Sequence, residues 1–102
     1  MNADTDLPEF ERSFQIMVVD DEAGFLRSLD VFLKRRGLNV TCLADGNVAL
    51  EVLEERRFDI LVTDLKMPGM DGIALATKAR ELHPDISIIL MTAYGTMNEA
   101  IQ

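Results

Sequence analysis

The chain reads Phe14-Gln15-Ile16-Met17-Val18-Val19-Asp20-Asp21-Glu22 near its amino end, an apolar run of one strand's length that stops at three acids. A short, mostly apolar run of this kind indicates a β-strand that is buried on both faces, as in a parallel sheet. We therefore expect an acidic corner at the carboxyl end of a buried strand.

Strand-like and helix-like segments alternate along the rest of the chain. Residues 38–43 predict a half-exposed edge strand, residues 59–63 predict a further buried strand, and residues 86–91 predict a fourth strand that is almost entirely apolar. Between the strands, apolar residues at helical spacing predict three helices. The residues expected to face inward are Phe25, Leu26, Leu29, Phe32, Leu33, Val48, Ala49, Val52, Leu53, Ile73, Leu75, Ala76, Ala79 and Leu82. Strict alternation implies an α/β fold with a parallel sheet and right-handed crossovers.

The two ends of the chain differ from this pattern. Residues 1–13 are acidic and lack periodicity, which predicts a flexible leader before a single domain over residues 14–102. Residues 96–99 read Thr-Met-Asn-Glu, a capping box that predicts the start of a fourth helix. The sequence stops one or two turns into that helix.

Composition excludes several classes of protein. The 102 residues have room for one domain, and the formal net charge of −8 argues against direct nucleic-acid binding. The sequence holds no apolar run long enough to span a membrane and no secretory signal, so we expect a cytoplasmic protein that does not bind membranes. The single cysteine, Cys42, is expected to be a reduced, partly buried thiol without a catalytic role.

The carboxyl ends of parallel strands share one edge of the sheet. Asp20 and Asp21 should therefore lie beside Asp64, which follows the strand at residues 59–63, provided that the two strands are neighbours. At about 5 Å and an effective dielectric near 20, each like-charged pair costs roughly 3 kcal/mol. A bound cation would neutralise this repulsion, and Mg²⁺ suits the site because it prefers carboxylate oxygens and water as ligands.

The alternative is a purely structural role for each Asp as a turn or helix-capping residue, which is common for single aspartates at strand ends. The combination of three acids with the hydroxyl of Thr92, which follows the strand at residues 86–91, favours a site instead. A carboxylate can attack phosphorus to form an acyl phosphate. The sequence has no phosphate-binding glycine loop of the nucleotide-binding kinds, so the phosphate should come from another protein or a small donor.

Three stretches resemble the receiver domain of two-component response regulators: Val18-Val19-Asp20-Asp21-Glu22, Thr63-Asp64-Leu65-Lys66-Met67-Pro68-Gly69-Met70-Asp71-Gly72 and Met91-Thr92-Ala93-Tyr94-Gly95-Thr96. The amino-acid sequence of the last stretch is most similar to that of receivers of sigma-54-dependent (NtrC-like) transcriptional activators. The resemblance implies a flavodoxin-like (CheY-like) doubly wound sheet of order 2-1-3-4-5.

The resemblance also implies a role for each site residue. Asp64 would accept a phosphoryl group from a sensor histidine kinase and relay the signal to an output domain, with transcription as the expected output. Asp21 would bind Mg²⁺ directly, Asp20 mainly through water, and the backbone carbonyl of Lys66 would complete the protein ligands, with Asp64. Thr92 would contact the phosphoryl group and move on phosphorylation, while Lys66 and Tyr94 would set the dephosphorylation rate. Such a domain assists its own phosphorylation but is a signalling switch, not an enzyme.

The fifth strand and fifth helix of the family have no counterpart in the sequence, so we expect a sheet of order 2-1-3-4. The apolar strand at residues 86–91 would then lie at an edge. A fragment of a longer regulator is the favoured explanation, and the alternatives are a strand supplied by another chain or pairing in a homodimer.

Two other functions stay open. The chain could be an interaction module that signals without phosphorylation, although intact Asp20, Asp21, Asp64 and Thr92 argue against it. It could also be a phosphatase with an aspartyl nucleophile, but that class would have a second acid where this chain has Lys66. His83, before Pro84 at a helix end, is expected to cap the helix and not to transfer phosphate.

Overall fold

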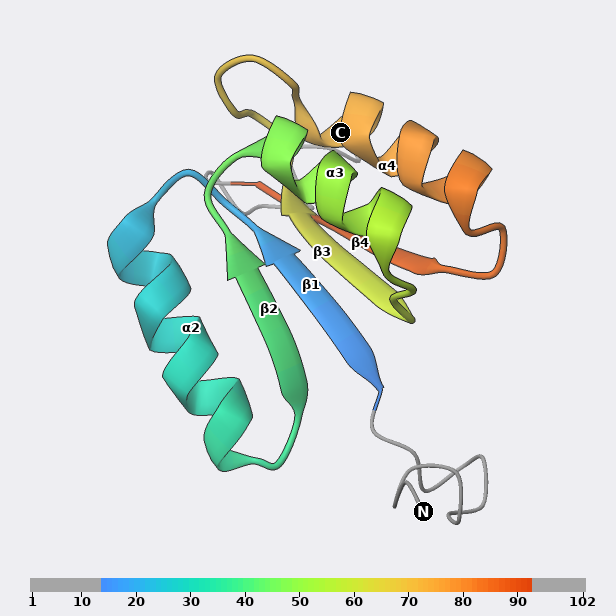
Figure 1. Ribbon diagram of the computed structural model, residues 1–102. Coiled ribbons are helices and arrows are strands. Elements are labelled where there is room, and N and C mark those ends of the chain that lie inside the picture. The colour runs from blue at the N-terminus through green and yellow to red at the C-terminus, as the bar shows by residue number, and fades with distance from the viewer. Residues whose placement is uncertain (1–13, 93–102) are drawn as a thin grey trace, which may run out of the picture.

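Four parallel strands form one sheet in the order β2-β1-β3-β4 (Figure 1). The structure, a computed structural model, describes residues 14–92. Its elements are β1 (Gln15–Val19), α2 (Ala23–Arg35), β2 (Asn39–Leu43), α3 (Gly46–Glu55), β3 (Ile60–Asp64), α4 (Gly72–Leu82) and β4 (Ser87–Met91). The predicted α/β class and the strand order 2-1-3-4 are confirmed. The predicted leader, Tyr94 and the predicted fourth helix lie outside the described residues.

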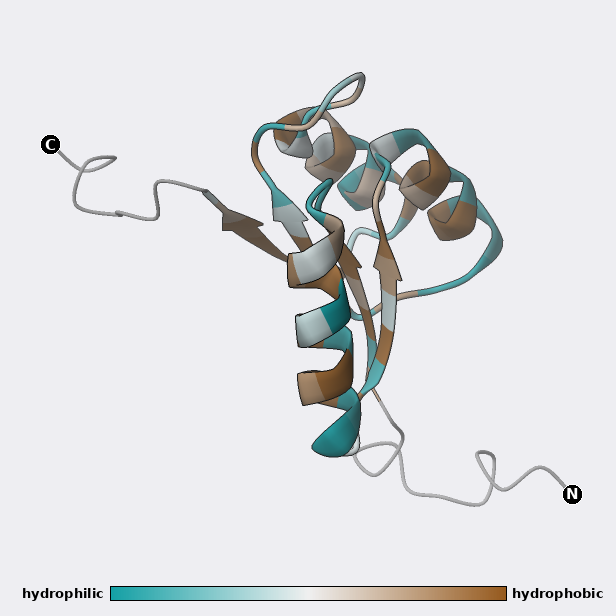
Figure 2. Ribbon diagram, turned by 90° about the vertical axis from the view of Figure 1, so that its left-hand side faces the viewer, coloured by the Kyte–Doolittle hydropathy of each residue, from teal (hydrophilic) through white to brown (hydrophobic). Residues whose placement is uncertain are grey.

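The helices lie on both faces of the sheet, α2 on one face and α3 with α4 on the other (Figures 1 and 2). Because successive residues of a strand point to opposite faces, β1 contributes to two cores. Met17 and Val19 pack with the α3 and α4 side, and Ile16 and Val18 pack with the α2 side. The predicted burial of β1 on both faces is confirmed.

Strand register brings the carboxyl ends of three strands level. Val19 of β1 pairs with Thr63 of β3, and Asp64 pairs with Met91 of β4. The residues that follow these pairs, Asp20 and Thr92, therefore emerge at the same edge of the sheet as Asp64. This is the adjacency of first and third strands on which the predicted site depends.

The helices begin with acidic caps. Glu22 accepts from the Gly24 N–H at 3.0 Å, Asp45 from the Asn47 N–H at 2.7 Å, and Asp71 from the Ala74 N–H at 2.8 Å. Each carboxylate satisfies a backbone donor that has no partner inside its helix and complements the positive end of the helix dipole. The predicted stop of α2 is confirmed, since Gly37 adopts a φ of +82° that favours glycine.

The inward faces of the helices are narrower than the apolar spacing predicts. Five residues that were expected to face inward are exposed, because the stripe that contacts the sheet takes only part of each apolar face. They are Phe25, Phe32, Val48, Ile73 and Leu82, with 40, 51, 43, 59 and 41% exposure. Leu26, Ala49, Leu53, Leu75 and Ala79 are buried as predicted.

The prediction that the apolar strand at residues 86–91 becomes an exposed edge is confirmed within the described residues. Ile89 and Leu90 are 53% and 43% exposed, although Ile86 just before the strand is buried. β4 is the outermost strand of the described sheet, beside β3 (Figure 1). β3 is intermediate, with Leu61 buried and Val62 half-buried. Within residues 14–92, no helix has the length and apolar character needed to cross a membrane.

Candidate functional site

Three carboxylates meet at the carboxyl edge of the sheet. Asp20 and Asp21 follow β1, Asp64 ends β3, and one oxygen from each lies within 4.8 Å of the others. Asp20 and Asp64 are half-buried, while Asp21 is exposed. The structure thus brings together the three acids that the sequence assigned to one corner.

The acids line a hollow of about 420 Å³. Thr92, which is half-buried, lines the same hollow, so the hydroxyl predicted to join the acids does so. The other lining residues are Glu22, Phe25 and Met91. The hollow therefore combines acidic groups, one hydroxyl and an apolar wall.

Electrostatics at this corner favour a proton or a cation beside Asp20. Burial raises the pKa of Asp20, and the neighbouring charges of Asp64, Asp21 and Glu22 raise it further. The Glu22 N–H donates to Asp20 Oδ1 at 2.9 Å and partly offsets these effects. A divalent cation would remove the repulsion between the carboxylates.

The donor set fits a hard divalent cation. Oxygen ligands at about 2.1 Å from an ion lie up to roughly 4.2 Å apart, so oxygens within 4.8 Å need only a small inward movement. Larger Ca²⁺, with ligands at about 2.3–2.6 Å, would need a smaller movement than Mg²⁺. Asp20, Asp21 and Asp64 are the residues that would hold such an ion, as predicted from the sequence.

Lys66 lies in the connection between β3 and α4, and its side chain is exposed. The preceding residue, Leu65, donates its N–H to the Met91 carbonyl at 2.9 Å and so ties the start of this connection to β4. The role of the Lys66 carbonyl as a metal ligand stays a prediction, as does the phosphoryl contact of Thr92.

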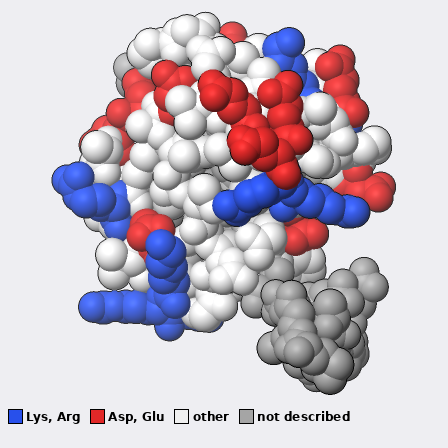
Figure 3. Space-filling view, in the orientation of Figure 1, with Lys and Arg blue, Asp and Glu red and all other residues white. Residues whose placement is uncertain are grey.

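Acidic side chains also gather elsewhere, over α3 (Figure 3). This helix exposes Glu51, Glu54 and Glu55, which the sequence predicted to face water. Their carboxylates stand on the outer face of one helix, where solvent screens them. The acidic corner differs because strands from separate parts of the chain force its acids together.

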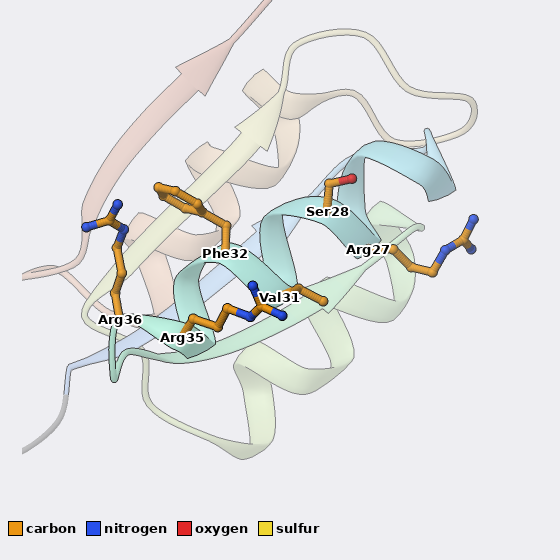
Figure 4. Close-up of a pocket in the computed structure, with 6 residues that line it drawn as sticks. All are labelled: Arg27, Ser28, Val31, Phe32, Arg35 and Arg36. Atoms are coloured by element: carbon orange, nitrogen blue, oxygen red, sulfur yellow. The ribbon is translucent and has the colours of Figure 1, made fainter.

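A larger hollow, of about 740 Å³, lies on the outer face of α2 (Figure 4). It is lined by Arg27, Ser28, Val31, Phe32 and Arg35 of that helix and by Arg36, which directly follows it. The Arg36 guanidinium stacks over the Phe32 ring at 4.4 Å, so part of this surface is engaged in a contact of its own. Its arginines carry no group that could attack phosphorus, and the acidic corner remains the candidate site.

Two expectations about residues outside the site are confirmed. Cys42 is a half-buried free thiol, and burial, together with the charge of Asp30, raises its pKa. His83 caps α4: its N–H donates to the Ala79 carbonyl at 2.8 Å, and its Nε2 lies 2.7 Å from the Leu53 carbonyl oxygen. Neither residue lines the acidic hollow.

Sequence reasoning missed two residues of the hollow, Phe25 and Met91. Phe25 was assigned to an inward helix face because it follows helical spacing, and Met91 was assigned to the fourth strand without a role in the site. Their position directly beside the acids in three dimensions depends on strand register, which the sequence pattern does not give.

Comparison with known proteins matches this chain to one protein family and to transcriptional regulators. The family model described as response regulator receiver domain matches residues 16–102. Transcriptional regulatory protein ZraR of Escherichia coli O157:H7 is 37% identical over 90 residues, which are 88% of this chain and 20% of ZraR. The DNA-binding transcriptional regulator NtrC of Salmonella typhimurium is 36% identical over 86 residues, 84% of this chain and 18% of NtrC.

A solved structure supports the same fold. The crystal structure of a response regulator protein from Burkholderia pseudomallei with a phosphorylated aspartic acid, calcium ion and citrate matches with a TM-score of 0.76 and 27% identity. The match covers 87% of this chain and 52% of that chain. The chain spans about a fifth of the length of the two curated relatives, at 20% and 18%. The predicted resemblance is confirmed: the chain belongs to the response regulator receiver domain family, with the transcriptional regulators NtrC and ZraR among its relatives.

Proposed function

We propose that this receiver domain is a phosphorylation-dependent switch in which Asp64 accepts a phosphoryl group, with Mg²⁺, from a sensor histidine kinase in the cytoplasm. One observation carries the proposal: carboxylate oxygens of Asp20, Asp21 and Asp64 lie within 4.8 Å of one another, in a hollow that Thr92 also lines. No single aspartate at a strand end would support it.

In the proposed transfer, a carboxylate oxygen of Asp64 attacks the phosphorus atom of a phosphohistidine. The bond between phosphorus and nitrogen breaks, and its electron pair leaves with the imidazole, which takes up a proton. Asp21 and Asp64, with the Lys66 carbonyl, would hold the cation, and Asp20 would hold it mainly through water. Positive charge at this position, which Mg²⁺ supplies when bound, screens the repulsion between Asp64 and the phosphoryl oxygens.

Thr92 serves the phosphorylated state in this proposal. A phosphoryl group on Asp64 adds a charge of about −2 and new acceptor oxygens, and the Thr92 hydroxyl donates to one of them. Movement of Thr92 toward that oxygen would alter the chain directly after β4 and so couple the site to the surface. The relatives ZraR and NtrC are named as transcriptional regulators, which supports an output in transcription beyond the receiver domain.

The Burkholderia pseudomallei protein supports the chemistry independently of sequence motifs. Its crystal structure holds a phosphorylated aspartic acid and a calcium ion. Calcium, like magnesium, is a hard cation that prefers oxygen ligands. We infer that the acidic corner of this chain takes the same two groups.

The test is phosphorylation by a small donor. The chain is incubated with phosphoramidate and Mg²⁺, and intact mass is measured for the wild type, Asp64→Ala and Asp85→Ala, whose exposed aspartate lies in the connection before β4. We expect the wild type and Asp85→Ala to gain one phosphate and Asp64→Ala to gain none. A phosphate on Asp64→Ala would overturn the assignment.

A further inference from the structure

The connection between β3 and α4 folds back on the end of β3. The Gly72 N–H donates to the Leu65 carbonyl at 2.9 Å, which closes residues 65–72 into a loop. The Leu65 N–H in turn donates to the Met91 carbonyl at 2.9 Å. The first residue of α4 is therefore held directly beside the residue that follows Asp64.

This approach leaves no room for a side chain at position 72. A Cβ atom on Gly72 would overlap the carbonyl oxygen of Asp64, and it would lie 2.9 Å from the Asp64 carbonyl carbon and 3.1 Å from the Leu65 Cα. The obstructing atoms are all backbone, so no side chain can rotate away. Gly72 is buried, and glycine inside a helix is less favourable than alanine. The close approach is what requires it.

The Asp64 carbonyl is held from a second side. The hydroxyl of Thr63, a fully buried residue, donates to the Asp64 carbonyl oxygen at 3.1 Å. Asp71 fixes the start of α4 by accepting from the Ala74 N–H at 2.8 Å. The backbone of Asp64 is thus confined between the Thr63 hydroxyl and the Cα of Gly72, and this confinement sets the direction of its carboxylate.

From these contacts we infer that Gly72 is a positioning residue for phosphoryl transfer to Asp64. It acts through the backbone of the acceptor and touches neither the phosphate donor nor the cation. The inference rests on the proposed function, because it takes Asp64 as the acceptor. It adds that the rate of transfer depends on the absence of a side chain at the first residue of α4.

A second glycine presses on the same loop from α3. A Cβ on Gly46 would lie 3.0 Å from the Met70 carbonyl oxygen and 3.1 Å from the Met70 Cβ. These distances are tight but not overlapping, so the loop would yield by a few tenths of an ångström. Gly46→Ala should therefore disturb the loop much less than Gly72→Ala.

The magnitude follows from the displacement. Gly72→Ala must separate the Asp64 carbonyl from α4 by about 1 Å, and a misplacement of that size costs up to about 100-fold in rate. We expect the saturating rate of phosphorylation by phosphoramidate to fall at least about tenfold in Gly72→Ala. We expect a fall of about threefold in Gly46→Ala. The phosphoramidate concentration at half the maximal rate should change little, because the donor's own contacts remain.

The matched control is Gly37→Ala. Gly37 has a φ of +82° and no atom within 4 Å of an added Cβ, and it follows the far end of α2. Alanine there destabilises the fold through backbone strain alone. Thermal unfolding of each variant is measured beside the rate, at a temperature where every variant is folded. If loss of stability alone slowed phosphorylation, Gly37→Ala would react as slowly as Gly72→Ala or Gly46→Ala when their melting temperatures are equal.

The outcomes separate the inference from the proposed function. If the wild type gains no phosphate on Asp64, the proposed function fails. If the wild type is phosphorylated and folded Gly72→Ala reacts at an equal rate, the positioning role of Gly72 is wrong. Should Gly72→Ala not fold, Gly46→Ala decides: a rate equal to the wild type at similar melting temperature overturns the inference.

Discussion

Replacing Asp20 by asparagine should stabilise the metal-free protein. Asparagine keeps an oxygen that can accept from the Glu22 N–H at 2.9 Å, but it removes a charge that repels Asp21 and Asp64. The three acids otherwise have no basic group in their shared hollow, among the residues that the structure describes. The substitution therefore relieves two like-charge contacts without removing the local hydrogen bond.

The magnitude can be worked out from the separation of the carboxylates. Two unit charges 4.8 Å apart repel by about 0.9 kcal/mol in bulk water and about 3.5 kcal/mol at an effective dielectric of 20. Because Asp21 is exposed and Asp20 and Asp64 are only half-buried, solvent screening places each pair near the lower figure. Two pairs then amount to about 1–2 kcal/mol, and for a domain of this size each kcal/mol raises the melting temperature by about 4–8 °C.

The assay is thermal unfolding in EDTA at pH 7 and at lower pH, with and without added Mg²⁺. Burial and neighbouring charge raise the pKa of Asp20, so the native state holds this proton more tightly than the unfolded chain does. The contribution of Asp20 to the stability of the metal-free wild type should therefore decrease as the pH rises from the ordinary value of 3.8 through the raised pKa. The advantage of Asp20→Asn should therefore be full at pH 7 and should narrow as the pH falls toward 3.8. Added Mg²⁺ should stabilise the wild type more than the variant.

The control is Glu54→Gln, which removes an acid from the exposed face of α3. It should change the melting temperature by no more than a fraction of the Asp20→Asn effect. The reasoning is refuted if Asp20→Asn lowers the melting temperature in EDTA, or if Mg²⁺ stabilises both proteins equally.

Three further predictions concern the thiol, the core and the sheet edge. Because burial raises the pKa of Cys42, its reaction with iodoacetamide in the folded protein should reach half its maximal rate at a higher pH than in the urea-unfolded chain; equal midpoints would contradict this. Leu53→Ala, at a fully buried position of α3, should destabilise the fold by about 2–5 kcal/mol in urea unfolding. Val48→Ala on the same helix, where Val48 is 43% exposed, should cost less than about 1 kcal/mol. Similar losses of stability in the two variants would reject the assigned inward face. Ile89→Lys places a charge on the outermost described strand, where Ile89 is 53% exposed. It should lower any concentration-dependent self-association measured by light scattering. Stronger association of the variant would contradict a role of this exposed strand edge in self-association.

The fold was predictable because its pattern is local. The apolar run of β1 and the helical spacing each reflect interactions within a few residues, and alternation of strands with helices leaves few topologies. The width of each buried face was not predictable in this way. Val48 and Ile73 satisfy the helical spacing, yet the sheet contacts only a narrower stripe of α3 and α4, which is a property of the assembled layers.

The site was predictable to the extent that it depends on strand ends. Asp20, Asp21 and Asp64 were assigned from the rule that parallel strands share one carboxyl edge. Phe25 and Met91 were missed because they enter the hollow through register and helix orientation. The lack of room for a Cβ atom at position 72 was missed for the same reason. In the sequence, Asp71-Gly72 indicates only a turn, and the contact with the Asp64 carbonyl is visible only in the folded structure.

The central claim is that three carboxylates from two adjacent strands converge on one divalent cation beside the phosphoryl acceptor. A crystal structure of the chain grown with Mn²⁺, with an anomalous difference map, tests it most directly. We expect one strong peak within about 2.5 Å of oxygens from Asp21 and Asp64, with Asp20 in contact directly or through water. A fully ordered corner without a peak, or with Asp64 turned away from an ion held elsewhere, would contradict the account.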